Sequence, residues 1–491
     1  MALLEIRNLN FTYSGKEEPA LKDISLSVES GDFVLLCGES GCGKTTLLKL
    51  LKPELRPAGR CEGEILFLDT PTDKLDARTS VTEIGYVMQN PENQTVTDKV
   101  WHELAFGLES LGESTPVIRR KVAEICGFFG IGDWYHKKTS ELSGGQKQLL
   151  ALASVMVMNP RVLILDEPTA QLDPIAAASF LASLRKINEE LGITVIIAEH
   201  RLEEVFPMAN RVLLMDRAKV CLYDTPRRVG ALLSGGTVPH KLAVGMPAAV
   251  RLFAALGESG ESPLTVREGK QYIATHFYDT EKRCELPEKP AEEREVAIGI
   301  AGGYFRYERE TPDVLSGLDL EIYKNEILCI LGANGAGKTT LLRVLSGVRR
   351  LYKGKYRLWG KKIKEYNTNT LYRGNIACLP QNPQNLFVKN TVYDDLLEVT
   401  KLFGIPKGER EEKIGRLADR LGITPLFGAH PYDLSGGEQQ KAALLKLLLM
   451  DPKILLLDEP TKGLDPASKV TFAAILADLK KEGKTIVLVT H

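Results

Sequence analysis

The sequence predicts an α/β protein made of two similar domains, each with a parallel sheet covered by helices on both faces. Three observations indicate this. A set of motifs for phosphate chemistry occurs twice, in the same order and at a nearly constant spacing, and a repeat of this length indicates two whole domains. In each copy, short apolar runs alternate with segments of helical character. The motifs directly follow the apolar runs, at the carboxyl ends of strands, where open α/β sheets bind ligands.

The apolar runs that lead into the motifs are the expected strands. They occupy residues 33–37 and 327–331 before the glycine loops, 162–165 and 454–457 before the Asp-Glu pairs, and 194–198 and 485–489 before the histidines. Continuous runs of this kind are typical of parallel strands buried on both faces. The first copy continues through 211–215 to Tyr223, which predicts another strand pair, whereas the second copy stops at His491. We therefore expect this chain to be an incomplete version of a longer protein.

Length and composition set limits on the class of protein. The chain has 491 residues, enough for about two to four domains. Its 63 basic and 64 acidic side chains create no overall field that favours nucleic acid or anionic lipid. No apolar run reaches the roughly 18 residues of a membrane span, and the N-terminus lacks the pattern of a secretory signal. The eight cysteines include no Cys-x-x-Cys, which indicates reduced thiols. We expect a soluble, intracellular protein.

The region between the two copies differs in composition from both. Residues 1–230 are expected to form the first domain and 296–491 the second, C-terminally truncated one. Residues 231–275 keep apolar spacing and are expected to be an appendage of the first domain. Residues 278–295 are rich in Glu, Lys and Pro and poor in apolar side chains, which is typical of an exposed linker.

Each copy contains Gly-x-x-x-x-Gly-Lys-Thr between an apolar run and a helix, the pattern of a phosphate-binding loop. Glycines let successive backbone N–H groups turn toward the phosphates, and the helix N-terminus adds its dipole. Lys44 and Lys338 are expected to reach the β- and γ-phosphates, and the hydroxyls of Thr45 and Thr339 to bind Mg²⁺. An ordinary glycine-rich turn is the alternative for a single match, but two matches in this strand–helix context favour the loop.

An Asp-Glu pair and a Leu-Ser-Gly-Gly segment also recur once per copy. In Asp166-Glu167 and Asp458-Glu459, the Asp is expected to hold Mg²⁺ and the Glu to orient or deprotonate the attacking water. Leu-Ser-Gly-Gly opens a helix, expected at 146–158 and 438–450, and offers a hydroxyl and N–H groups to an anion. Solvated carboxylates and a simple helix cap are the alternatives for isolated instances. Because the Leu-Ser-Gly-Gly segment has no lysine placed like Lys44, it is expected to complete a site built mainly elsewhere.

The order of these motifs resembles that of the ATP-binding cassette (ABC) ATPases. Phosphate loop, glutamine segment, Leu-Ser-Gly-Gly, Asp-Glu-Pro-Thr, Leu-Asp-Pro and a final His follow one another in both copies, over nearly the whole chain except the linker. The resemblance implies two P-loop domains, each with a RecA-like core, an antiparallel β subdomain and a helical subdomain, in a head-to-tail pseudo-dimer. It implies ATP and Mg²⁺ as ligands. Neither copy lacks its Lys, Asp-Glu pair or His, so we expect hydrolysis at both sites.

The resemblance also implies that ATP lies between the phosphate loop of one domain and the Ser-Gly-Gly segment of the other. Site one would join the first phosphate loop to residues 435–438, and site two the second loop to residues 143–146. The catalytic residues implied are Glu167, His200, Glu459 and His491, the two histidines being those that contact the γ-phosphate. The Mg²⁺ ligands implied are Thr45, Gln89, Asp166, Thr339, Gln381 and Asp458.

The ATP-binding residues implied in the first copy are Tyr13, Gly38, Glu39, Ser40, Gly41, Cys42, Gly43, Lys44, Thr45, Thr46, Gln89, Ser143, Gly144, Gly145 and Gln146. Those implied in the second copy are Tyr307, Gly332, Ala333, Asn334, Gly335, Ala336, Gly337, Lys338, Thr339, Thr340, Gln381, Ser435, Gly436, Gly437 and Glu438. The two tyrosines match the aromatic residue that stacks on adenine in this family, and strand-end packing is the alternative role.

The segments around the two glutamines narrow the resemblance. Residues 87–94 and 100–107 look like those of ATPases in energy-coupling factor (ECF) transporters, which import vitamins and transition-metal ions, and 379–386 is a looser match. The resemblance implies an ECF-type transmembrane coupling subunit and a substrate-binding membrane component as partners, no nucleic acid, and a peripheral position on the cytoplasmic face of the membrane. The segment after each glutamine would grip the transmembrane partner. Its apolar residues Val96, Val100 and Leu104 fit that role or a place in the core equally well.

Two other functions stay open, and the copies differ in detail. A twin-cassette protein acting on ribosomes or nucleic acid would favour a basic insert between the copies, but this linker has more acidic than basic side chains. A fused sugar-importer ATPase often has a degenerate second phosphate loop, whereas Lys338 and Thr339 are present here. Cys42 lies inside the first phosphate loop and Ala336 at its place in the second. We expect alkylation of Cys42 to block the first site by its bulk.

Overall fold

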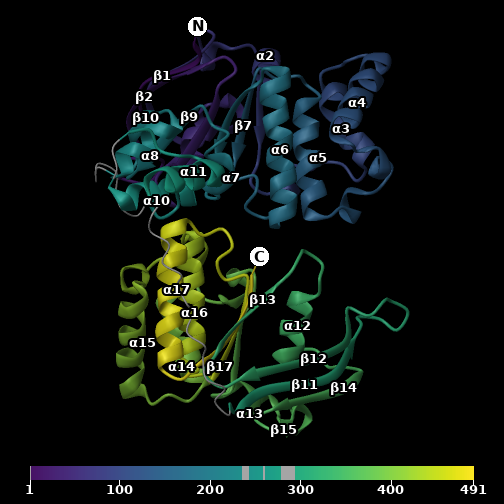
Figure 1. The fold of residues 1–491 in the computed structure, drawn as a ribbon, viewed down its shortest axis with the longest axis vertical. Coiled ribbons are helices and arrows are strands. Elements are labelled where there is room, and N and C mark those ends of the chain that lie inside the picture. Colours follow the sequence, from purple (N-terminus) through teal and green to yellow (C-terminus); the bar gives the residue numbers. More distant parts are fainter. Residues whose placement is uncertain (1, 235–242, 258–259, 278–293, 491) are drawn as a thin grey trace. The chain divides into compact units, whose positions relative to one another are not determined.

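The computed structural model describes residues 2–234, 243–257, 260–277 and 294–490. The chain forms two compact units, one made mainly of residues up to 282 and the other mainly of residues from 283. Each has the α/β architecture that the sequence predicts (Figure 1). The predicted linker up to residue 293 and His491 lie outside the described residues. None of the helices in these ranges is long and apolar enough to cross a membrane.

The first unit is built on a six-stranded sheet in the order β10-β9-β3-β8-β7-β6. The strands from β9 to β6 are parallel, and β10 closes one edge in the antiparallel direction. All residues of β3, β7 and β8 are buried, which confirms the strands predicted from apolar runs. The bounds are β3 (Phe33–Gly38), β6 (Ile84–Val87), β7 (Val162–Asp166), β8 (Thr194–Ala198), β9 (Arg211–Asp216) and β10 (Lys219–Asp224).

An antiparallel sheet in the order β2-β1-β4-β5 covers part of this core. Its inward side chains, with those of α1, form one hydrophobic core against the parallel sheet, and α6 packs on a second core that includes Phe33 and Leu163. Its strands are β1 (Ala2–Tyr13), β2 (Leu21–Glu29), β4 (Gly59–Phe67) and β5 (Thr70–Pro71). The two cores hold the parallel sheet between them, so the positions of the loops at its carboxyl edge are fixed.

The helix α6 of the first unit has a capping residue at each end. In α6, Asp173 caps the N-terminus by accepting from the Ala176 N–H at 2.9 Å, and Gly192 ends the helix in the left-handed conformation. Figure 1 shows α3 and α4 beside α5, where they form a separate helical core. The helices are α1 (Lys44–Leu50), α2 (Ala77–Glu83), α3 (Val100–Ser110), α4 (Thr115–Phe129), α5 (Gly144–Met156), α6 (Pro174–Leu191), α7 (Leu202–Val205), α8 (Pro226–Ser234), α10 (Ala248–Leu256) and α11 (Val266–His276).

The second unit repeats this plan with sheets in the orders β12-β11-β14-β15 and β13-β18-β17-β16. Its strands are β11 (Val296–Phe305), β12 (Leu315–Tyr323), β13 (Ile327–Leu331), β14 (Lys353–Leu358), β15 (Lys361–Lys362), β16 (Ile376–Leu379), β17 (Ile454–Asp458) and β18 (Thr485–Thr490). Its helices are α12 (Lys338–Leu345), α13 (Thr368–Tyr372), α14 (Val392–Leu402), α15 (Lys407–Leu421), α16 (Gly436–Leu448) and α17 (Pro466–Lys481).

Two details of the prediction are wrong. The sequence predicts that β13 is buried on both faces, but its Leu331 is 67% exposed. Among the described strands β13 pairs only with β18, whereas β3 lies between β8 and β9. The helices predicted at 146–158 and 438–450 begin and end earlier, as α5 and α16. Ser143 and Ser435 are themselves the N-caps, so each helix starts directly after the serine.

A buried ion pair distinguishes the helical core of the second unit. The Lys446 ammonium on α16 donates to Asp395 Oδ2 on α14 at 2.6 Å and to the Leu386 carbonyl, and the Asp395 side chain is 1% exposed. In the first unit, the carboxylate of Glu103 at the matching position accepts from the N–H groups of Val96 and Thr97. Ser154, at the position of Lys446, donates only within its own helix. The second unit therefore depends on a cation that the first does not need.

We predict that Lys446→Met lowers the free energy of unfolding of the second unit by about 3 kcal/mol, because Asp395 would stay buried without its cation. The matched variant Ser154→Ala in the first unit should cost less than about 1 kcal/mol. Native-state hydrogen exchange of α14 and α3 measures the two effects. Equal losses in the two variants would contradict this account of the pair.

Candidate functional site

The loop between β3 and α1 adopts the conformation that the glycine pattern predicts. Gly43 has φ +105° and precedes the first residue of α1, and a Cβ there would lie 2.5 Å from the Ala20 carbonyl oxygen. At Gly38, a Cβ would lie 2.3 Å from the Met215 carbonyl oxygen. Only glycine fits such close approaches of backbone to backbone. Gly337 has the equivalent left-handed conformation before α12.

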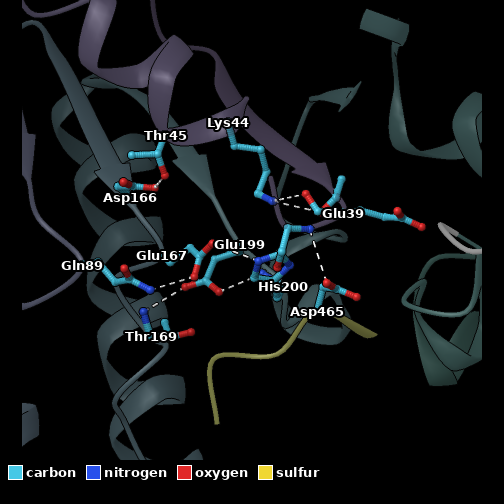
Figure 2. A network of polar contacts seen from close by, with 12 residues as sticks. Glu39, Lys44, Thr45, Gln89, Asp166, Glu167, Thr169, Glu199, His200 and Asp465 are labelled. Atoms are coloured by element: carbon cyan, nitrogen blue, oxygen red, sulfur yellow. Dashed lines mark hydrogen bonds and ion pairs between the residues drawn. The ribbon is translucent and has the colours of Figure 1, made fainter. Parts of the chain in front are cut away.

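The lysine of each loop is buried and folded back over the loop. Lys44 Nζ donates to the carbonyl oxygens of Gly38 at 3.0 Å and Glu39 at 2.9 Å (Figure 2). Lys338 Nζ does the same with Gly332 at 2.7 Å and Ala333 at 3.0 Å. The ammonium is therefore held at the mouth of a loop of backbone N–H groups, where it can donate to a phosphate oxygen.

The phosphate loop is tied to the Asp-Glu pair by one hydrogen bond in each unit. Thr45 Oγ1 donates to Asp166 Oδ1 at 3.0 Å, and Thr339 Oγ1 donates to Asp458 Oδ1 at 3.1 Å. Burial, together with the charge of Glu167, raises the pKa of Asp166 to about 6, and burial also raises the pKa of Asp458. A hydroxyl and a buried carboxylate that is costly to ionise form an oxygen donor set that fits Mg²⁺. Within the described ranges, no group of three or more His, Cys, Asp and Glu side chains is arranged to hold a metal ion.

The glutamate of each Asp-Glu pair has an unusual backbone conformation. Glu167 has φ 46° and Glu459 has φ 47°, which is uncommon outside glycine and occurs often at functional sites. Each backbone is held by a hydrogen bond from its N–H to the next strand, to Ala198 O and Val489 O respectively, both at 3.0 Å. The turn directs each carboxylate toward the predicted glutamine. Gln89 Nε2 donates to Glu167 at 2.9 Å, and Gln381 Nε2 donates to Glu459 at 2.7 Å.

His200 contacts the same glutamate from the neighbouring strand. Its Nε2 lies 2.9 Å from Glu167 Oε1 (Figure 2). Burial would raise the pKa of Glu167, but the hydrogen bond and charge of His200 hold it below its ordinary value. Glu167 is therefore ionised at neutral pH and can accept a proton.

Sequence reasoning missed Glu199, which fixes the position of His200. Its carboxylate is 1% exposed and accepts from the N–H of Thr169 at 2.9 Å and of His200 at 3.1 Å. Burial raises its pKa. A glutamate at a strand end is normally solvated, so no motif could have identified this one. The second unit has Thr490 at the matching position.

The second unit places a cation beside its glutamate. Lys462 Nζ lies 3.3 Å from Glu459 Oε2, and the first unit has Ala170 at the matching position. The loops that follow the two Asp-Glu pairs therefore differ in structure, because only the second has this lysine. The two glutamates therefore differ in the charged side chains described beside them.

The structure also brings the two predicted tyrosines to the phosphate loops. The Tyr13 hydroxyl shares a hydrogen bond with Thr46 Oγ1 at 2.8 Å, and the Tyr307 hydroxyl shares one with Thr340 Oγ1 at 3.0 Å. Both rings are exposed at the ends of their strands. Tyr13 also packs edge-on against Phe11, so strand-end packing and an exposed ring face occur together.

The Ser-Gly-Gly segments are helix caps in both units. Ser143 accepts from the Gln146 N–H at 3.3 Å, and Gln146 Oε1 accepts from the Ser143 N–H at 3.0 Å. In the second unit, Glu438 Oε2 accepts from both the N–H and the hydroxyl of Ser435, at 2.8 and 2.6 Å. This reciprocal capping pre-forms the start of α5 and α16.

Comparisons with known proteins agree with this geometry. The family model for the ABC transporter matches residues 21–170 and again 315–462. A Bacillus cereus protein named as an ABC transporter ATP-binding protein is 42% identical over 494 residues, covering 100% of this chain and 87% of that protein. A similarly named Methanosarcina acetivorans protein is 32% identical over 530 residues, covering 100% of this chain and 80% of that protein. The solved structure of an archaeal ribosome recycling factor, in complex with a ribosomal stalk protein, has a TM-score of 0.58 at 22% identity, covering 98% and 84% of the two chains, and indicates the fold alone.

We predict that iodoacetamide reacts with Cys42 more slowly than with the exposed thiols of Cys61 and Cys221. Cys42 is buried in the first phosphate loop, and burial raises the pKa of its thiol although Lys44 opposes this. Because only the thiolate reacts, the rate should increase as the pH rises from neutral toward about 9. Peptide mapping against time measures it.

The rate of ATP hydrolysis should fall as Cys42 is slowly modified, and it should not fall as Cys61 and Cys221 are quickly modified. Cys42→Ala, which gives the first loop the residue that the second loop has at position 336, should remove the sensitivity. Loss of hydrolysis in step with Cys61 labelling would contradict this prediction.

Proposed function

We propose a function from the premise that the chain belongs to the ABC transporter family and is an ATP-hydrolysing subunit. In this proposal it energises import of a vitamin, vitamin precursor or metal ion through separate ECF-type membrane subunits. Its proposed partners are a transmembrane coupling subunit and a substrate-binding membrane component. Its proposed place is the cytoplasmic face of the membrane. The ECF-like sequence around Gln89 supports the choice among transporters.

An exposed valine after the glutamine in both units is the observation that carries the proposal. Val96 is 67% exposed and Val388 is 71% exposed. Each follows the turn that begins at the glutamine, and each N–H is held by the buried carboxylate of the next helix, Glu103 or Asp395. An apolar side chain is kept in solvent at the same place in both units, which supports a role in contact with a partner.

The other apolar residues of this segment belong to the core. Val100 and Leu104 are fully buried in α3, with Val392 and Leu396 at the matching places in α14. The two roles that the sequence left open are therefore divided between residues. Val100 and Leu104 support the segment, and Val96 is the residue available to a partner.

For the chemistry, we propose that Glu167 and Glu459 each take a proton from the water that attacks the γ-phosphate. Gln89 and Gln381, bonded to these carboxylates, would position them, and His200 would contact the γ-phosphate. Mg²⁺, held by Thr45 and Asp166 in one unit and Thr339 and Asp458 in the other, would neutralise charge on the phosphates. His491 has the corresponding proposed role at the second site.

The Ser-Gly-Gly segments would complete these sites across the two units. We propose that residues 435–438 act with the first phosphate loop and residues 143–146 with the second. The support is chemical: each pre-formed helix start offers N–H groups to an anion but has no lysine of its own like Lys44.

Affinity purification of the chain from native membranes tests the transport proposal. We expect an integral membrane protein to co-purify, and we expect Val96→Asp with Val388→Asp to abolish its recovery while ATP binding is retained. Val266→Asp, at another exposed valine on α11, is the matched control and should change nothing. Recovery of ribosomes, or of no membrane protein at all, would refute the proposal.

A further inference from the structure

The second unit contains a pocket that shares no residue with the predicted nucleotide sites. Its volume is about 540 Å³, and its lining residues come from β14, β15, α13 and the segment that follows α12. A volume of this size is typical of sites for small molecules. All of its lining residues belong to the second unit, between Gly347 and Tyr372.

The lining of the pocket is strongly basic. Six of its lining residues are basic, and none is acidic: Arg349, Arg350, Lys355, Arg357, Lys362 and Lys364. In the part of the chain that the structure describes, none of these six side chains forms an ion pair with a carboxylate of the protein. Such a concentration of positive charge in a concave site attracts anions, and its walls reduce screening by water.

Two of these cations oppose each other across paired strands. Arg357 on β14 is the register partner of Lys362 on β15, and both are exposed. Like charges directly opposite in an antiparallel pair are destabilising, so this pair costs free energy until an anion lies between or over them. In the first unit the matching pair is Leu66 and Pro71, which carry no charge.

The corresponding surface of the first unit has the opposite charge. Between residues 350 and 369 there are seven basic side chains and one acidic one, whereas between 59 and 78 there are three basic and five acidic. In the strand register, Lys353 and Lys355 stand where Glu62 and Glu64 stand in β4. The fold therefore does not require the basic residues, because the same sheet forms with acidic ones.

Three tyrosines complete the walls and are held in place by the backbone. The hydroxyl of Tyr356 donates to Leu345 O, that of Tyr366 to Leu358 O at 3.0 Å, and that of Tyr372 to Ser346 O at 3.0 Å. With their hydroxyls committed, the rings offer the pocket apolar surface in fixed positions. A ligand with a ring and several anionic groups would match both parts of the lining.

We propose that this pocket binds a small organic phosphate, a ring-bearing ligand with more than one phosphate group, at a site separate from the ATP sites. Arginine forks and lysine ammonium groups are the side chains that bind phosphate oxygens best. Arg349 lies in the pocket and also places its guanidinium 5.8 Å from the ring centroid of Tyr307. The pocket is therefore next to the predicted adenine-stacking residue but does not include it. The ligand could be a free phosphate ester or the headgroup of a phosphorylated lipid.

Calorimetric titration with inositol trisphosphate tests the proposal on the full chain, with saturating ADP and Mg²⁺ present so that the phosphate loops are occupied. We expect one binding event that weakens as salt is added. Arg357→Gln with Lys362→Gln should lower the affinity at least about tenfold. The matched control, Arg119→Gln with Arg120→Gln, removes two adjacent exposed cations from α4 of the first unit and should change the affinity less than about twofold.

A second measurement separates loss of the site from loss of folding. Without ligand, the Arg357→Gln, Lys362→Gln variant should melt no lower than the parent protein, because it removes the like-charge pair. Vesicles of phosphatidylcholine with and without phosphatidylinositol bisphosphate distinguish the sources of the ligand. Competition between anionic vesicles and inositol trisphosphate would assign a lipid headgroup, and its absence would assign a free phosphate ester.

Three results would overturn the proposal. The first is no binding of inositol trisphosphate to the parent protein. The second is an equal loss of affinity in the control variant, which would show a general field and no site. The third is binding of anionic vesicles or of single-stranded RNA to a protein that does not bind inositol trisphosphate. If Arg357→Gln with Lys362→Gln abolished that binding, the pocket would be a charged surface for a macromolecule.

Discussion

The parallel order of four strands is the constraint on which both sites depend. In the first unit, β3, β8, β7 and β6 lie side by side, although the chain visits them in the order β3, β6, β7, β8. Their carboxyl ends therefore present the phosphate loop, His200, Asp166-Glu167 and Gln89 along one edge. The second unit repeats this order with β13, β18, β17 and β16. The hydrogen bond from the loop threonine to the buried aspartate then fixes α1 to the end of β7 in the first unit. It fixes α12 to the end of β17 in the second unit.

This geometry is the same in both units, and the differences lie around it. The threonine–aspartate and glutamine–glutamate bonds agree between the copies to within 0.2 Å. By contrast, Glu199 and Ala170 in the first unit are replaced by Thr490 and Lys462 in the second. Glu167 lies 2.9 Å from His200 Nε2, and Glu459 lies 3.3 Å from Lys462 Nζ. The asymmetry concerns the residues around the two glutamates, and both glutamates are retained.

Much of the fold followed from the sequence because its signals are local. Apolar runs of 5 or 6 residues, as in β3 and β7, predict buried parallel strands, and glycine spacing predicts a loop whose backbone approaches its neighbours closely. The exposure of β13 could not be predicted in the same way, because it depends on which strands flank it. Val96 and Val100 are similar in sequence, and only packing separates the exposed one from the buried one. The burial of Glu199 and the basic pocket could not be predicted from composition, because they depend on tertiary contacts and strand registers and the overall charge is balanced.

The central claim is that each unit has its own working glutamate. The steady-state rate of ATP hydrolysis by Glu167→Gln and by Glu459→Gln, made separately, tests it most directly. Glutamine keeps the size and polarity of the side chain but cannot accept the proton, so each single variant should lose about half of the rate or more, and the double variant should be inactive. An unchanged rate in either single variant would contradict the claim, because that unit would then bind nucleotide without hydrolysing it.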